Sequence, residues 1–163
     1  MSLTEIRSEY LAAKSLFSEK AKVRLAEAFT EFLNKHESVQ ALGFLAYTPA
    51  YSDGDQTVYS VHDLHVKLNE AEEKQCRSCH AKLTADIKFC SECGTKVRTS
   101  RSFYDEFKGS YELKGESQLA EDLKELSREL TSLDEIVKDI FDDHAKITFT
   151  KEDGFVVEEW EHE

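Results

Sequence analysis

The sequence is poor in residues that interrupt secondary structure. Its 163 residues include one proline and six glycines, so we expect long helices and strands with few breaks. No run of about 20 apolar residues is present, which argues against a membrane-spanning helix. No apolar stretch follows the charged N-terminus, which argues against a secretory signal. We therefore expect a cytoplasmic protein without membrane association.

Cysteine is also scarce, and its placement is informative. The four cysteines form two C-x-x-C pairs separated by ten residues. In the reducing cytoplasm such pairs indicate a metal site before they indicate disulfides. Two thiolates two residues apart span one edge of a tetrahedron, the geometry that zinc prefers. The predicted ligands are Cys76, Cys79, Cys90 and Cys93; iron with the same ligands and a redox dithiol pair are the alternatives.

The stretch CRSCHAKLTADIKFCSECGTKV resembles a zinc ribbon of the short rubredoxin-knuckle type. Gly94 follows the second pair, where the knuckle backbone needs a positive φ, and His80 takes that position in the first. Leu83 and Phe89 lie where such ribbons form a small apolar patch. Four cysteines close the coordination sphere, so we expect structural and not catalytic zinc.

The net charge of −12 is unevenly distributed. Residues 74–101 carry seven basic and two acidic residues, whereas residues 39–73 and 102–163 have net charges of −5 and −12. The basic segment is typical of an ordinary solvated surface, and it could also be a contact site for nucleic acid or an acidic partner; the acidic flanks oppose nucleic acid because they repel phosphate. The possible contact residues are Arg77, Lys82, Lys88, Lys96, Arg98 and Arg101.

A second candidate site surrounds the turn YTPAYSDGD. Its residues could form a carboxylate pocket for a cation or a basic group, or could simply build an Asp-Gly turn. On a continuous strand, His62 and His65 fall on opposite faces, while Asp63 and His65 share one. The possible binding residues are Tyr47, Asp53, Asp55, Asp63 and His65.

The same segment resembles a family of small uncharacterised bacteriophage and bacterial proteins with a motif close to Y-T-P-x-F-N-D-G-D. The matching residues are Tyr47, Thr48, Pro49, Asp53, Gly54 and Asp55, and the tail EEWEHE matches loosely. The resemblance brings no activity with it. It implies a phage-type accessory or host-interaction protein, which would act in the host cytoplasm.

Hydrophobic periodicity predicts the elements. Residues 2–37 form a helix that begins with a Ser2–Glu5 capping box and carries an apolar stripe from Ile6 to Phe32. Residues 38–48 form a strand covered on both faces, with Val39 and Ala41 on the same face; 56–68 form its return strand, and 147–160 a hairpin that turns at Gly154. A helical region covers 116–143, where Ser132 and Glu135 could form a second capping box that begins a separate helix. Residues 99–115 give no clear assignment.

We therefore predict an α+β fold in which helices pack on a four-stranded, mostly antiparallel sheet. The two halves of this domain are residues 1–73 and 99–163, and the zinc ribbon is inserted between them at 74–98. Leucines and related residues at 119–140 repeat as a heptad seam. The seam predicts either packing within the chain, giving a monomer, or a homodimer.

No catalytic triad, phosphate loop or nucleotide-binding fingerprint is present in the sequence. The function that we predict is therefore non-enzymatic: a zinc-binding interaction protein that binds another protein. One alternative is a divalent-cation-dependent hydrolase or nucleotide-binding protein that uses Asp53, Asp55, Asp63 and His65. Another is a nucleic-acid-binding protein that uses the basic ribbon.

Overall fold

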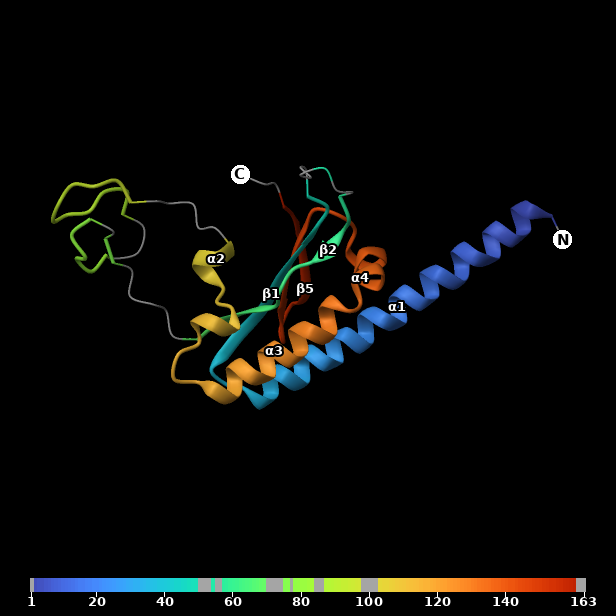
Figure 1. Cartoon of the computed structure of the whole chain (residues 1–163), viewed down its shortest axis with the longest axis horizontal. Helices are drawn as coiled ribbons and strands as arrows, with labels where there is room; N and C mark the ends of the chain where they lie inside the picture. Colours follow the sequence, from blue (N-terminus) through green and yellow to red (C-terminus); the bar gives the residue numbers. More distant parts are fainter. Residues whose placement is uncertain are drawn as a thin grey trace.

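The computed structural model describes residues 2–49, 54, 57–69, 75–76, 78–83, 87–97 and 103–160. Figure 1 shows an α+β body with a long helix projecting from one side and the cysteine segment lying on the other. In chain order the elements are α1 (Leu3–Lys35), β1 (Val39–Tyr47), β2 (Ser60–Val61), β3 (His65–Leu68), α2 (Phe103–Glu106), the 3₁₀ turn η1 (Ser110–Glu112), α3 (Ser117–Thr131), α4 (Asp134–Phe141), β4 (Ala145–Thr150) and β5 (Gly154–Glu159).

An antiparallel sheet organises the body, which confirms the predicted fold class. β1 lies at its centre and pairs on one side with β4, which continues into the β4–β5 hairpin. On its other side β1 pairs with both β2 and β3. The predicted return strand over 56–68 was wrong in one respect: it is broken at residues 62–64 into the two short strands β2 and β3.

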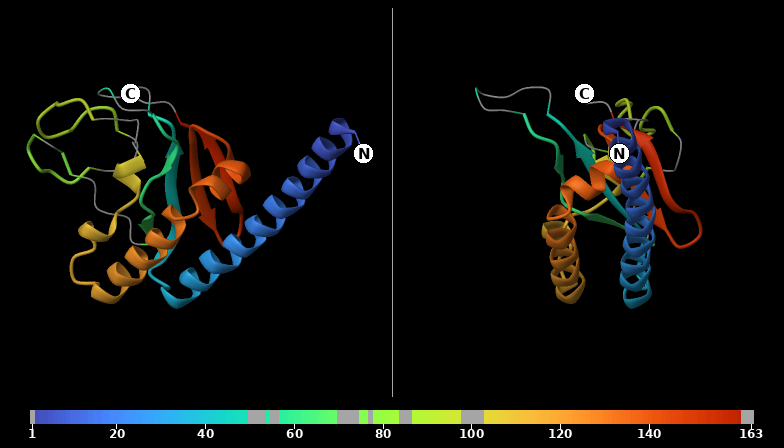
Figure 2. Two further views of the ribbon diagram at one scale, coloured as in Figure 1. Left: turned by 45° about the vertical axis from the view of Figure 1, so that its right-hand side comes forward. Right: turned by 90° about the vertical axis from the view of Figure 1, so that its right-hand side faces the viewer.

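Helices cover one face of the sheet and build the main core (Figure 2). Phe29 of α1 is fully buried and meets the rings of Phe44, Phe149 and Phe155 at centroid distances of 5.5–6.3 Å. α3 and α4 contribute Leu119, Leu123, Leu130, Val137 and Phe141 to the same cluster. Edge-to-face aromatic packing and apolar burial are therefore the main forces that hold the helices to the sheet.

A smaller cluster covers the opposite face, as the two-sided apolar pattern of β1 predicts. Phe103 and Phe107 of the α2 segment stack on each other at 4.8 Å and pack on Ala41 and Leu45. A Cβ atom at Gly43 would lie 2.8 Å from the Phe107 ring, so glycine is what lets α2 approach the sheet this closely.

One residue of β1 departs from the predicted alternation. Val39 packs in the main core and not with Ala41, because a register shift between Val39 and Ala41 reverses the facing of the strand there.

α1 begins as predicted, with both hydrogen bonds of the Ser2–Glu5 capping box present. However, only its C-terminal end is buried, at Phe29, Phe32 and Leu33. Residues 2–17 are exposed throughout, so the first part of the predicted apolar stripe covers no core in this chain. No helix in the described ranges is long and apolar enough to cross a membrane.

The region 116–143 is two helices, and the predicted capping box at Ser132 is wrong. Ser132 lies at the end of α3, where its hydroxyl donates to the carbonyl of Glu129, and α4 begins after Leu133 without a side-chain cap. Four heptad positions are buried inside the chain: Leu119, Leu123, Leu130 and Val137. Packing within the chain therefore uses most of the seam; a homodimer through it remains a prediction.

Candidate metal centre

The cysteine segment lies between β3 and α2 and stands apart from the body (Figure 1). Neither core cluster contains any of its described residues. Each half is a small hairpin that is closed by an isolated β-bridge. The bridge joins Gln75 and Lys82 in the first half, and Phe89 and Lys96 in the second. The segment thus has little apolar packing of its own, and small units of this kind are usually stabilised by a metal or disulfides.

The two knuckles have equivalent backbones. In the first, the amide of His80 donates to the carbonyl of Cys76; in the second, the amide of Gly94 donates to that of Cys90. His80 has a φ of 59° and Gly94 a φ of 73°. The sequence prediction that histidine takes the left-handed position of the first knuckle is confirmed.

The four sulfur atoms converge to a tetrahedral site. All lie within 4.8 Å of one another, and the Sγ–Sγ distances are 3.5 Å for Cys76–Cys93 and 3.6 Å for Cys79–Cys90. A tetrahedron with Zn–S bonds of about 2.3 Å has edges of about 3.8 Å. The donor set therefore fits structural Zn²⁺ in size and in chemistry, because four thiolates satisfy its coordination and leave no position for a reacting water.

The site is half enclosed, and one thiol is prepared for ligation. Cys76 and Cys90, the first cysteine of each knuckle, are buried, whereas Cys79 and Cys93 are exposed. The Sγ of Cys93 lies 3.1 Å from the hydroxyl oxygen of Thr95. Hydrogen bonding with the hydroxyl and the backbone amide of Thr95 lowers the pKa of Cys93 to about 6, whereas desolvation and hydrogen bonding with Cys90 and Cys93 raise the pKa of Cys79 to about 12. A thiolate at neutral pH is the form that binds metal.

Basic and apolar side chains surround the centre. Lys82, Lys88 and Lys96 are exposed. Phe89 is 59% exposed and Leu83 is partly buried, so any apolar patch that they form lies at the surface of the ribbon. Three predicted contact residues lie outside the described ranges: Arg77, Arg98 and Arg101.

The second predicted site does not assemble around the residues that the structure describes. Asp63 reaches α3, where its carboxylate accepts a 3.4 Å hydrogen bond from Ser127, whereas the ring of His65 packs against Phe103 and Tyr104 of α2. They point to opposite faces of the sheet, so the prediction of a shared face was wrong; Asp53 and Asp55 lie outside the described ranges.

The break at residues 62–64 also brings the two histidines to the same face. His62 stacks on Tyr47 at 4.2 Å, and Tyr47 packs against the cluster around Phe103, which His65 also contacts. The prediction that they lie on opposite faces was therefore wrong.

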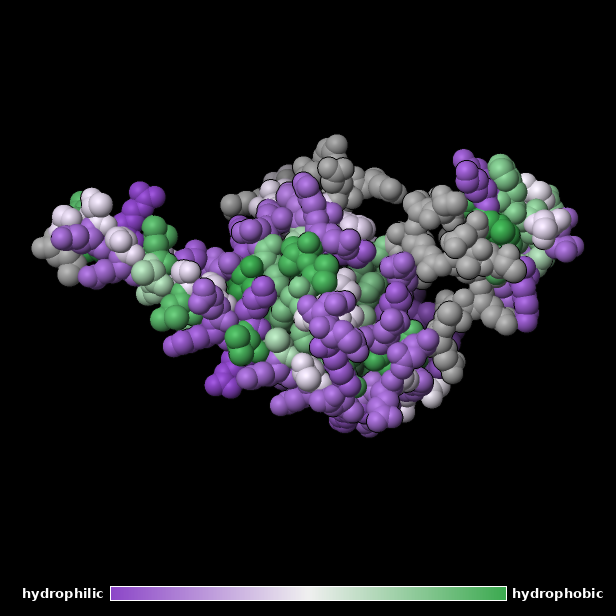
Figure 3. Space-filling model, turned by 180° about the vertical axis from the view of Figure 1, so that it is seen from behind, coloured by the Kyte–Doolittle hydropathy of each residue, from purple (hydrophilic) through white to green (hydrophobic). Residues whose placement is uncertain are grey.

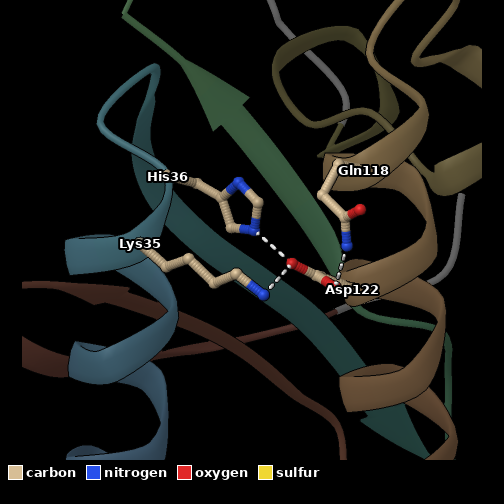
Figure 4. A network of polar contacts seen from close by, with 4 residues as sticks. All are labelled: Lys35, His36, Gln118 and Asp122. Atoms are coloured by element: carbon tan, nitrogen blue, oxygen red, sulfur yellow. Dashed lines mark hydrogen bonds and ion pairs between the residues drawn. The ribbon is translucent and has the colours of Figure 1, made fainter.

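Sequence reasoning missed two polar networks. The carboxylate of Asp143 accepts hydrogen bonds from the amide and the hydroxyl of Thr48, at 2.8 and 2.7 Å. Asp122 of α3 contacts Lys35, His36 and Gln118 at 2.7–2.8 Å (Figure 4) and joins the end of α1 to the start of α3. Hydrogen bonds from Lys35, which has the larger effect, and from His36 lower the pKa of Asp122 to about 2. His36 and Asp122 are 86 residues apart along the chain, so no local pattern reveals their contact.

Comparison with known proteins agrees with this geometry. The family model for the zinc-ribbon domain matches residues 75–97 of the sequence, which include all four cysteines. No curated protein and no solved structure matches the chain. Residues 75–97 thus form a zinc-ribbon domain, whose four cysteines supply the ligands of a structural zinc ion.

Proposed function

We propose that this protein is a non-enzymatic zinc-binding protein whose ribbon binds another protein, in the manner of a phage-type accessory or host-interaction protein. The observation that carries the proposal is the position of the ribbon: its zinc site lies outside both cores, yet it presents exposed lysines and Phe89. A zinc site that only stapled a loop would need no such side chains. The phage association rests only on the resemblance around YTPAYSDGD.

The surface chemistry favours an acidic protein partner. Phe89 offers an exposed aromatic ring, and Lys88 and Lys96 lie next to it in sequence and across its bridge. Protein interfaces are enriched in aromatic residues, so Phe89 is the candidate anchor, and the lysines beside it would favour an acidic partner through complementary charge. The zinc ion fixes the backbone on which these side chains are mounted, which lowers the entropy lost on binding.

A double substitution in the ribbon tests the proposal. Tagged wild-type protein, Lys88→Glu/Phe89→Ala and the control Lys124→Glu, an exposed site on α3, are used to capture partners, and the binding of each purified partner is then measured. Loss of a hot-spot ring costs about 2 kcal/mol or more, a roughly 30-fold weaker Kd. Equal binding by the double variant with its zinc content intact would refute the proposal.

Single-stranded nucleic acid is a second candidate, and the exposed Phe89 favours it. An aromatic ring among lysines can stack a base while the cations neutralise phosphates. The net charge of −5 and −12 on the flanking segments opposes this binding. An oligonucleotide titration at several salt concentrations distinguishes nucleic-acid binding from protein binding. If the ribbon binds phosphates, the logarithm of the binding constant falls linearly with the logarithm of the salt concentration.

A further inference from the structure

We infer that the projecting part of α1, residues 3–20, is the arm of a homodimer, and that it binds antiparallel along α1 of a second copy. The arm is exposed on its apolar side as well as its polar side, with Leu3 85% and Tyr10 62% exposed. Figure 3 shows hydrophobic residues along the projecting helix, seen from behind the molecule. An isolated helix of this length is marginally stable in water, so an apolar stripe on it calls for a partner.

The stripe of the arm continues into a groove on the body. Leu3, Ile6, Tyr10, Ala13 and Phe17 follow one another at spacings of three and four residues. Ala21, Leu25 and Ala28 extend the same face and line a hollow of about 230 Å³. Leu126, Leu133, Ile136 and Ile140 of α3 and α4 form its other wall. This volume is below that of typical small-molecule pockets, about 300–1,000 Å³, and suits inserted side chains.

The size of the side chains favours a second copy in antiparallel orientation. The exposed half of the stripe carries large residues, whereas the groove half carries two alanines. An antiparallel pairing about a two-fold axis near residue 15 places Leu3 opposite Ala28, Ile6 opposite Leu25 and Tyr10 opposite Ala21. Each of these three large side chains then meets a small or recessed position, and both copies make the same contacts, as a two-fold interface requires. The overlap from residue 3 to residue 28 is about 39 Å long at 1.5 Å per residue.

The charges are consistent with self-association. Residues 3–20 contain three acidic and three basic residues, so the arm is neutral in a chain with a net charge of −12. The antiparallel register also brings Glu9 of one copy near Lys20 of the other, on the same edge of the stripe. A parallel pairing would instead bring Glu9 near Lys14, which already pairs with Asp139 at 3.1 Å.

Sedimentation velocity of the full-length protein tests the inference. We expect a concentration-dependent dimer, with Tyr10→Glu in the arm and Ala28→Glu in the groove each weakening it about tenfold or more. Tyr111→Glu, the same substitution at an exposed tyrosine of η1, is expected to leave the dimer unchanged. Circular dichroism and thermal unfolding of each variant verify that it is folded.

A charge exchange tests the orientation. Glu9→Lys and Lys20→Glu are each expected to weaken the dimer, and the two together to restore it, because the antiparallel register pairs these positions. A wild-type protein that stays monomeric at about 100 μM overturns the inference. So does a dimer that is insensitive to Tyr10→Glu, or a double charge exchange that fails to restore association.

Discussion

Two phenylalanines of α1, twelve residues apart, are expected to respond very differently to truncation. Phe29 is fully buried and contacts three aromatic rings of the sheet, whereas Phe17 is 56% exposed. Phe29→Ala should lower the free energy of unfolding by about 3–5 kcal/mol, through lost burial and a residual cavity. Phe17→Ala should change it by no more than about 0.5 kcal/mol in the monomer, as for most surface substitutions.

Urea unfolding followed by circular dichroism measures both changes, and the protein concentration adds a second test. Because the inferred dimer would stabilise the folded chain by mass action, the cost of Phe17→Ala should rise with concentration while that of Phe29→Ala should not. The reasoning would be refuted if Phe29→Ala cost less than about 1 kcal/mol. It would also be refuted if Phe17→Ala were equally costly at a concentration where the wild type is monomeric.

Three further substitutions test the remaining contacts. Gly43→Ala should destabilise the body by about 1–3 kcal/mol in urea unfolding, because its Cβ would overlap the α2 rings; an unchanged midpoint would contradict the close packing. The pKa of Asp122 is lowered from 3.8 to about 2, so its stabilising contribution is complete above pH 4 and lost as the pH falls through about 2. Asp122→Asn should therefore flatten this part of the stability–pH profile relative to wild type, and parallel profiles would count against the network. Cys90→Ser should remove zinc in metal analysis yet leave the thermal unfolding of the body nearly unchanged, since neither core uses ribbon residues; global unfolding would disprove this independence.

Features set by local spacing were predictable from the sequence. The ligand set Cys76, Cys79, Cys90 and Cys93 follows from spacing alone, and so does the positive φ at His80, because the knuckle dictates both. The capping box of α1 was predictable because it joins residues three apart in the sequence. The central position of β1 was predictable because its residues are apolar on both faces.

Features set by tertiary contacts were not predictable. The break at residues 62–64 reversed the facing of His65 relative to Asp63, because a one-residue slip exchanges the two faces of a strand. Periodicity identifies the apolar face of α1 but does not show how far along the helix the rest of the body covers it. Exposed Phe17 and buried Phe29 were therefore indistinguishable in the sequence. The contacts of Asp122 join helices that are distant in sequence.

The closed zinc centre is the central claim of this account, and X-ray absorption spectroscopy of the purified protein at the zinc edge tests it most directly. Four convergent cysteine sulfurs predict one zinc per chain bound by four sulfurs at about 2.3 Å. A nitrogen or oxygen ligand in the first shell would contradict the account, because it would reveal an open position for water or substrate. Bound iron, or disulfides without any metal, would contradict it equally.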